Sequence, residues 1–354
     1  GPLTTTETVK EVMLFDHCTW DDDYKEITQK IRRDLLKLAQ VEETEYTTVL
    51  MQGSGSFGVE SVLGSVVPKD GCVLLLSNGA YGERAAKMCS YYEIPCIHVK
   101  QDYNKTPDAN EAEELLKTHP EITHIMMIHS ETTSGILNDI ESIGKLAEAY
   151  GKVFIVDAMS SFAGVEIPVK DWYIDFLISS ANKCIQGVPG FSFIIANRVL
   201  LMESKGRARS LCLDLYDQWA GMEKDGKWRY TSPTHVVLAF EQAMKELEQE
   251  GGIKARHARY QKNMDTLVEN FENLGFRLYV DKAWQGPIIA TFLYPEGKHF
   301  DFQEMYAYIK ERGYAIYPGK LTDADTFRIG VIGEIYEEDV LRLTEIMKSY
   351  MEQA

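Results

Sequence analysis

The chain has 354 residues, of which 45% are hydrophobic and 26% are charged, a composition typical of globular proteins. This length favours one large domain and a smaller one over a single small core. The formal net charge of -17 argues against nucleic acid as a partner, because phosphate backbones are bound by basic surfaces. A small anion is not excluded, since a local arginine or a helix N-terminus can bind one.

The six cysteines are scattered along the chain, and none forms a CxxC pair. We therefore expect reduced thiols, a cytoplasmic location and no metal site. The sequence contains no run of about 18 apolar residues, so we expect no membrane partner.

Between about residues 45 and 200, short apolar runs alternate with amphipathic stretches. Continuous apolar runs are typical of strands buried on both faces of a parallel sheet. Alternation of such strands with helices predicts an α/β fold with a mainly parallel sheet of about seven strands. The expected strands are 47–51, 73–76, 96–99, 124–128, 153–156, 176–178 and 191–195, and the expected helices are 81–92, 110–117 and 140–150.

The C-terminal part of the chain has a different pattern. Residues 232–275 indicate long helices interrupted at Gly251 and Gly252. We expect short strands and a closing helix to follow, which predicts a smaller α+β domain. The expected boundaries are 16–250 for the large domain and 251–354 for the small one. The predicted strands are 276–280, 288–292, 315–317 and 326–331, and the closing helix is 337–351.

Lys183 is the residue that most clearly indicates chemistry. It lies between an apolar strand and a stretch containing glycine and proline, an unusual place for a surface lysine. Asp157 stands at the end of another apolar strand. A lysine that forms a Schiff base and an aspartate that holds a pyridinium nitrogen are two groups that pyridoxal phosphate needs. We therefore predict Lys183 and Asp157 as catalytic residues, with Ser180 and Asn182 as polar contacts to the cofactor phosphate.

A loop rich in glycine and serine follows the first predicted strand of the sheet. It contains Ser54, Gly55 and Ser56, and an amphipathic stretch follows it. Hydroxyl groups and the free amides of a helix N-terminus can bind an anion. The spacing matches neither a Walker loop nor a dinucleotide fingerprint. An ordinary turn is the alternative interpretation.

Two further segments place polar residues after predicted strands, where open α/β sheets bind ligands. Tyr81 could stack on a flat cofactor ring or simply close the core. Thr132 or Thr133 could hydrogen-bond a phenolate oxygen of the cofactor, and His129 is more typical of a buried core histidine.

Two later segments also carry polar groups. Arg328 lies between Phe327 and Ile329 in a predicted strand, so it needs a partner such as a carboxylate or phosphonate, unless it is a surface residue of an edge strand. Ser232 precedes Pro233 and is expected to cap a helix.

Together these segments resemble the fold type I enzymes that depend on pyridoxal phosphate, and in particular the class V aminotransferase branch. The resemblance runs nearly from end to end. The residues that carry it are 1–10, 52–57, 78–82, 130–135, 156–161, 179–187, 230–235 and 327–330.

The resemblance implies a role for each matching residue. Lys183 would hold pyridoxal 5'-phosphate covalently, and Asp157 would pair with its ring nitrogen. Ser54, Gly55 and Ser56 would bind the phosphate, together with Thr231 from the neighbouring subunit of a homodimer with shared active sites. Tyr81 would stack on the ring, Thr133 would lie near its O3' oxygen, and Arg328 would bind the anionic end of each substrate. Residues 1–15 would lie near the active site.

The resemblance also implies an activity. The expected reaction is transamination between 2-aminoethylphosphonate and pyruvate, a step of phosphonate degradation. An alanine–glyoxylate or serine–pyruvate aminotransferase of the same branch is the alternative. A catalytically silent homologue is disfavoured because Lys183 and Asp157 are both present, and a cysteine desulfurase is disfavoured because no cysteine follows Cys212.

Overall fold

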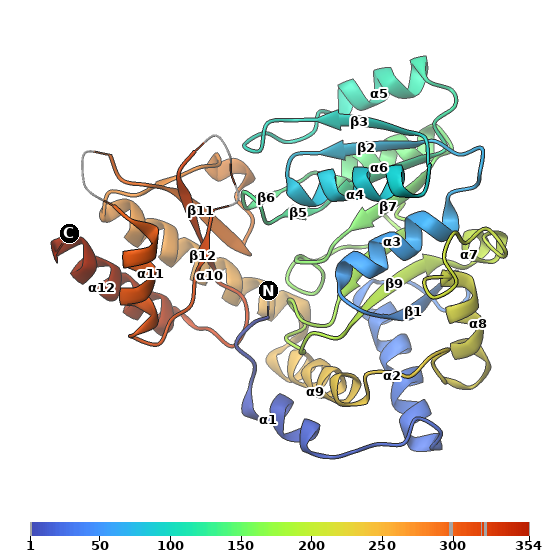
Figure 1. The fold of residues 1–354 in the computed structure, drawn as a ribbon, viewed down its shortest axis with the longest axis horizontal. Coiled ribbons are helices and arrows are strands. Elements are labelled where there is room, and N and C mark those ends of the chain that lie inside the picture. Colours follow the sequence, from blue (N-terminus) through green and yellow to red (C-terminus); the bar gives the residue numbers. More distant parts are fainter. Residues whose placement is uncertain (1, 297–299, 320, 322–323, 354) are drawn as a thin grey trace.

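The computed structural model describes residues 2–296, 300–319, 321 and 324–353. Figure 1 shows two sheets, each packed against helices, with the longer sheet in the first two thirds of the chain and the shorter one near the C-terminus. The N-terminal segment runs between these two parts. The predicted combination of a large α/β part and a smaller α+β part is therefore confirmed.

The large sheet has seven strands in the order β1-β9-β8-β7-β4-β2-β3. All neighbouring pairs are parallel except those of β9, which runs antiparallel to β1 and β8. The predicted, mainly parallel sheet is thus confirmed, with β9 as the exception. The strands are β1 (Tyr46–Gln52), β2 (Val73–Ser77), β3 (Cys96–Lys100), β4 (His124–Ile128), β7 (Val153–Asp157), β8 (Phe176–Ser180) and β9 (Phe191–Asn197).

Helices cover both faces of this sheet. Successive side chains of β1 point to opposite faces of the sheet, and both faces are apolar. Leu50 belongs to one hydrophobic cluster, whereas Val49 and Met51 belong to the other. One face packs against α3 (Gly55–Val66), α4 (Ala80–Tyr91), α7 (Arg198–Glu203) and α8 (Leu215–Asp225). The other packs against α2 (Asp22–Leu38), α5 (Ala109–Thr118), α6 (Ile140–Ala149) and α9 (Thr234–Glu250).

The smaller sheet has four antiparallel strands in the order β10-β11-β13-β12. Its core is rich in aromatic rings, and Phe271, Phe292 and Phe327 lie within contact of one another. The strands are β10 (Arg277–Leu278), β11 (Ile289–Leu293), β12 (Tyr317–Pro318) and β13 (Thr326–Gly330), and the helices are α10 (Gly252–Asn273), η2 (Lys282–Trp284), α11 (Phe302–Lys310) and α12 (Glu337–Gln353).

The remaining short elements are α1 (Glu7–Glu11), η1 (Val12–Leu14) and the hairpin β5 (Ser130–Glu131) with β6 (Ile136–Leu137). The N-terminal segment touches the smaller sheet's part of the chain, where the Thr4 carbonyl accepts a hydrogen bond from the Glu334 amide. Within the described residues, no helix has the length and apolar character needed to cross a membrane.

The start of α9 differs from the prediction. Pro233, not Ser232, is the N-cap residue, and α9 begins at Thr234. The Ser232 hydroxyl instead forms a 2.6 Å hydrogen bond with the Tyr24 hydroxyl. A distant partner that the sequence pattern does not reveal therefore takes the side chain that could have capped the helix.

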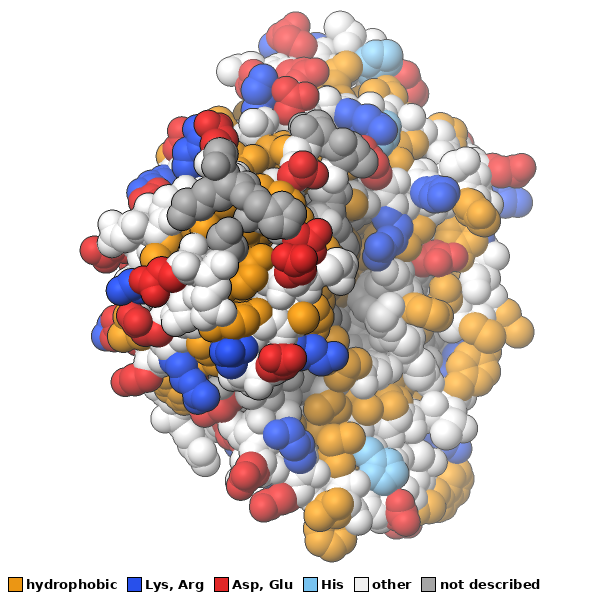
Figure 2. Space-filling view, turned by 60° about the vertical axis from the view of Figure 1, so that its left-hand side comes forward, with side chains coloured by type: hydrophobic (Ala, Val, Ile, Leu, Met, Phe, Trp, Pro, Cys, Tyr) orange, Lys and Arg blue, Asp and Glu red, His pale blue; other side chains and the backbone are white. Residues whose placement is uncertain are grey.

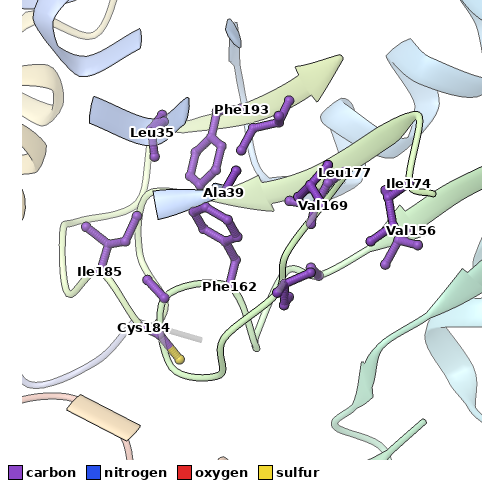
Figure 3. Close-up of a cluster of buried hydrophobic side chains, with 14 of the residues drawn as sticks. Leu35, Ala39, Val156, Phe162, Val169, Ile174, Leu177, Cys184, Ile185 and Phe193 are labelled. Atoms are coloured by element: carbon purple, nitrogen blue, oxygen red, sulfur yellow. The ribbon is translucent and has the colours of Figure 1, made fainter. Parts of the chain in front are cut away.

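The chain after Lys183 is anchored in the core of the large sheet. Figure 3 shows Cys184 and Ile185 in the buried cluster that contains Phe162 and Phe193. The Cys184 thiol also donates to the carbonyl of Ser160 at 3.0 Å. Burial of two consecutive side chains fixes the backbone next to the lysine.

Candidate active site

Several predicted site residues meet at the carboxyl ends of the parallel strands. Asp157 ends β7 and Ser180 ends β8, while the loop after β1 carries Ser54. Because these strands run in one direction, their ends lie at one edge of the sheet. A cavity of about 240 Å³ lies there, lined by Ser54, Gly55, Ser56, Val59, Tyr81, Arg84, Ala85, Met88, Asp157, Met159, Ser180, Asn182 and Lys183.

Asp157 is the buried acid of this cavity. It is 6% exposed, and its Oδ1 accepts a hydrogen bond from the Met159 amide at 2.9 Å. Burial raises the pKa of Asp157 to about 7, although that hydrogen bond and the charges of Arg84 and Lys183 lower it. A cation in the cavity would stabilise the ionised form. A protonated ring nitrogen carries such a positive charge, and its proton can be donated in a hydrogen bond to the carboxylate.

The N-terminus of α3 opens into the same cavity. Ser54 is its N-cap residue, and no side chain caps the first turn. The Phe57 amide donates to the Ser54 carbonyl at 2.9 Å, and the amides before it, which have no acceptor within the helix, are available to an anion. Gly55 allows the backbone of this turn to lie close to the Met159 side chain, since a β-carbon at residue 55 would lie 2.1 Å from the sulfur of Met159. These features fit a phosphate group.

Tyr81 and Arg84 lie near the start of α4 and line the cavity together. The Arg84 guanidinium lies 5.1 Å from the centre of the Tyr81 ring, and its Nη1 donates to the Ser56 hydroxyl at 2.9 Å. Arg84 thus joins the aromatic side chain to the anion-binding end of α3. A planar ring with a phosphate tail needs both kinds of contact.

A second cavity of about 160 Å³ adjoins the first. Lys183 and Tyr81 line both, so they stand at the boundary. The second cavity is lined by Leu3, Tyr81, Thr132, Ser160, Lys183, Ile288, Ile289, Tyr317, Arg328, Gly330 and Ile332. Its walls therefore come from both sheets and from the N-terminal segment.

Arg328 is the buried cation of the second cavity. It lies in β13 and is 5% exposed. Its Nε donates to the Pro318 carbonyl at 3.0 Å, and its Nη1 donates to the Thr132 carbonyl at 2.8 Å. A guanidinium has five N–H donors, so these two bonds orient the group and leave further donors for an anion. The arginine is thus no surface residue.

The face shown in Figure 2 is hollowed along its middle, and lysine and arginine side chains lie beside the hollow together with acidic ones. Local positive charge near a cleft can attract anionic ligands to a protein that is acidic overall.

Two predicted site residues do not line either cavity. Thr133 is fully buried, and its hydroxyl is used within the protein, because it donates to Glu131 at 2.6 Å and accepts from the Ala80 amide at 3.0 Å. It thereby fixes the start of α4, next to Tyr81. Thr231 is exposed, and its carbonyl accepts a hydrogen bond from Gln52 at 3.3 Å.

His129 also lies outside both cavities. It is buried, and burial lowers its pKa to about 3. Its Nδ1 forms a 2.9 Å hydrogen bond with the hydroxyl of Ser161. The histidine is therefore a satisfied core residue, as its sequence context suggests.

The structure adds lining residues that the sequence interpretation missed. Arg84 lies three positions after Tyr81, and helical spacing places such residues on one face. Met159 follows Asp157 by two positions and packs against Gly55. Tyr317 joins the second cavity only because β12 pairs with β13, where it lies opposite Arg328. A long-range pairing of this kind leaves no local signal.

A larger hollow of about 500 Å³ lies between α2 and α9. Among its charged side chains, Asp34 already pairs with Lys30 and Lys37. Convergent buried polar groups distinguish a functional cavity from a larger surface hollow. We therefore place the site at the two smaller cavities.

Comparison with known proteins identifies the family. The model of the aminotransferase class-V family matches residues 17–342. The chain therefore belongs to this family and is an aminotransferase. Its cofactor is pyridoxal 5'-phosphate, which members of the family use. The buried acid, the open helix N-terminus, the aromatic side chain and the lysine of the first cavity fit this group.

The most similar relatives include two curated bacterial proteins. The 2-aminoethylphosphonate–pyruvate transaminase of Bacillus cytotoxicus is 56% identical, over 98% of this chain and 94% of the relative. The protein of the same name from Lysinibacillus sphaericus is 55% identical, over 99% and 96%. Among solved structures, an alanine–glyoxylate aminotransferase from Nostoc sp. is 22% identical, has a TM-score of 0.92, and is covered over 93% of its length by 99% of this chain. That likeness shows the shared fold.

Proposed function

We propose that this protein transfers the amino group of 2-aminoethylphosphonate to pyruvate, which gives phosphonoacetaldehyde and L-alanine. The observation that carries the proposal is the position of Lys183 between two cavities. One cavity offers Asp157 and the α3 N-terminus to the cofactor, and the other offers Arg328 to an anionic substrate. The names of relatives at 56% and 55% identity support the choice of substrates.

The cofactor, when bound, supplies an aldehyde that takes up the amino group and a ring that withdraws electrons from the reacting carbon. The protein's residues prepare that chemistry. Asp157 would keep a positive charge on the ring nitrogen, and Tyr81 would offer its aromatic ring for stacking. Ser54, Gly55 and Ser56 hold the phosphate with their backbone amides and hydroxyls, with Ser180 and Asn182 beside them.

Lys183 acts as the proton carrier. Its amine would take a proton from the substrate carbon that bears the nitrogen and would deliver it to the cofactor carbon that takes up that nitrogen. Arg328 binds the phosphonate of the donor and the carboxylate of pyruvate, and so aligns each substrate with the lysine. Kinetics of the ping-pong type follow, because one product leaves before the second substrate binds.

We also propose a cytoplasmic homodimer in which Thr231 of each subunit contacts the phosphate held by the other. Its exposed position and its contact with Gln52, just before the phosphate-binding loop, support this assignment. In the proposed division of the chain, 16–250 bind the cofactor, 251–354 supply Arg328, and 1–15 close the substrate cavity. The place of Leu3 among the lining residues supports the last role.

The test is a comparison of amino donors. Purified protein loaded with cofactor is mixed with pyruvate or glyoxylate and with 2-aminoethylphosphonate, alanine or serine at equal concentrations. We expect phosphonoacetaldehyde and alanine at a rate at least about tenfold above every other pair. Equal or faster turnover of alanine with glyoxylate, or of serine with pyruvate, would instead assign the protein to those activities.

A further inference from the structure

The backbone that follows Lys183 makes a strained turn. The Gln186 amide donates to the Lys183 carbonyl at 2.7 Å, and Gln186 has a φ of 69°. The left-handed region is unfavourable for a residue with a β-carbon. Gln186 is only 2% exposed, so surrounding structure has to stabilise this conformation.

The side chain of Gln186 provides that stabilisation. Its Oε1 accepts hydrogen bonds from the Tyr260 hydroxyl at 2.6 Å and from Nη2 of Arg259 at 3.0 Å. Both partners belong to α10. The lysine turn is therefore tied to a helix that packs against the smaller sheet.

Arg259 extends the connection to the other side of the substrate cavity. Its Nη1 donates to the carbonyls of Gly333 and Ile335 at 2.8 and 2.9 Å, and its Nε donates to Glu250 at 2.7 Å. Gly333 lies shortly after β13, the strand that carries Arg328. One guanidinium thus holds both the turn of Lys183 and the segment that continues from Arg328.

This connection matters because the two substrates carry their anionic groups at different distances from the reacting carbon. In 2-aminoethylphosphonate a methylene group separates the reacting carbon from the phosphonate, whereas the carboxylate of pyruvate is bonded directly to the reacting carbon. With the reacting carbon held at the lysine, the phosphonate therefore lies about 1.5 Å farther from it than the carboxylate does. A site that binds both substrates therefore depends on the distance that the fold sets between Arg328 and Lys183.

We propose that Gln186 and Arg259 are positioning residues that fix Lys183 relative to Arg328, and thereby set the affinity of the site for the anionic end of each substrate. Neither residue lines either cavity. They act through the backbone of the lysine turn and of the segment 331–335. The inference rests on the proposed function, because it takes Lys183 and Arg328 as the groups at the two ends of the substrate.

The experiment compares the variants Gln186→Gly, Arg259→Ala and Arg259→Lys with the wild-type enzyme. Glycine tolerates the φ of residue 186 and removes only the side-chain bonds. Lys262→Ala is the matched control, since Lys262 lies on the same helix and loses only a surface ion pair with Glu337. Cofactor retention, KM for both substrates and kcat are measured for each variant.

We expect Gln186→Gly and Arg259→Ala to raise KM for both substrates about tenfold, roughly the effect of one lost hydrogen bond, while kcat falls less than about threefold. The cofactor absorbance should be retained. Arg259→Lys should be intermediate, because it keeps the charge beside Glu250 without the fork of donors. The Lys262→Ala variant should match the wild type.

Unchanged KM values in Gln186→Gly, with or without reduced thermal stability, would overturn the proposal. If Arg259→Ala does not fold, Gln186→Gly and Arg259→Lys decide the matter. A failure of the proposed function is distinguishable, because the wild-type enzyme itself would then not react with 2-aminoethylphosphonate.

Discussion

Burial and function oppose each other at Asp157. The carboxylate lies in the core at the end of β7, where ionisation is costly, yet one of its neighbours in the cavity is Lys183. Burial raises its pKa from 3.8 to about 7. In the proposed function, a cation on the ring nitrogen of the bound cofactor would offset this cost, because it would stabilise the ionised aspartate.

The protein without its cofactor should therefore lose stability as the pH rises. Between pH 3.8 and about 7 the folded chain keeps a proton on Asp157 that the unfolded chain has released, so this contribution is present at low pH and lost through about pH 7. Asp157→Asn removes the titration and keeps an oxygen for the Met159 amide. At pH 8 we expect its free energy of unfolding to exceed that of wild type by about 2–4 kcal/mol.

Urea unfolding of the cofactor-free proteins at several pH values measures this difference. It should shrink as the pH falls from about 7 to 3.8, the range in which the folded wild-type protein holds a proton that the unfolded chain has released. Parallel pH profiles for the two proteins would contradict the assigned burial effect.

The elements show which parts of a fold a sequence reveals. The strands of the large sheet were predictable because each is a short apolar run followed by polar residues, as in β4 and β7. Their polar ends also revealed Asp157 and Ser180. By contrast, the antiparallel direction of β9 and the pairing that brings Tyr317 to Arg328 depend on distant contacts. The role of Thr133 in fixing α4 likewise depends on a contact across the sheet edge.

The packing of two helices predicts opposite effects on stability when a glycine in each is replaced by alanine. In α6, a β-carbon on Gly144 would lie 1.9 Å from the backbone carbonyl oxygen of Trp172. In α8, a β-carbon on Gly221 would have no atom nearer than 3.6 Å. Gly144→Ala should thus destabilise the protein by about 1–3 kcal/mol, whereas Gly221→Ala should stabilise it by about 0.5–1 kcal/mol.

Thermal unfolding of the two variants beside wild type checks the contrast. The helix propensity of alanine acts at both positions, so the difference between them isolates the steric contact. Equal shifts in melting temperature would show that α6 moves away from Trp172 at little cost.

At the scale of the whole molecule, the cavity that holds Arg328 is built from three parts. The large sheet supplies Lys183, the smaller sheet supplies Arg328, and the N-terminal segment supplies Leu3. In the proposed dimer, Thr231 of the neighbouring subunit would join the other cavity, where the phosphate binds. Light scattering should then give a mass of twice 40.2 kDa, and Thr231→Ala should weaken cofactor retention without changing that mass. A monomer with full activity would exclude the shared site.

The most direct test of the central claim is a spectrum of the cofactor bound at Lys183. The purified enzyme, loaded with pyridoxal phosphate, should have a visible absorption band that 2-aminoethylphosphonate removes in the absence of any keto acid and pyruvate restores. In the Lys183→Ala variant, 2-aminoethylphosphonate followed by pyruvate should not remove and then restore this band. A band that responds to alanine or serine but not to the phosphonate would contradict the proposed substrate. The absence of any visible band after cofactor addition would contradict the role of Lys183.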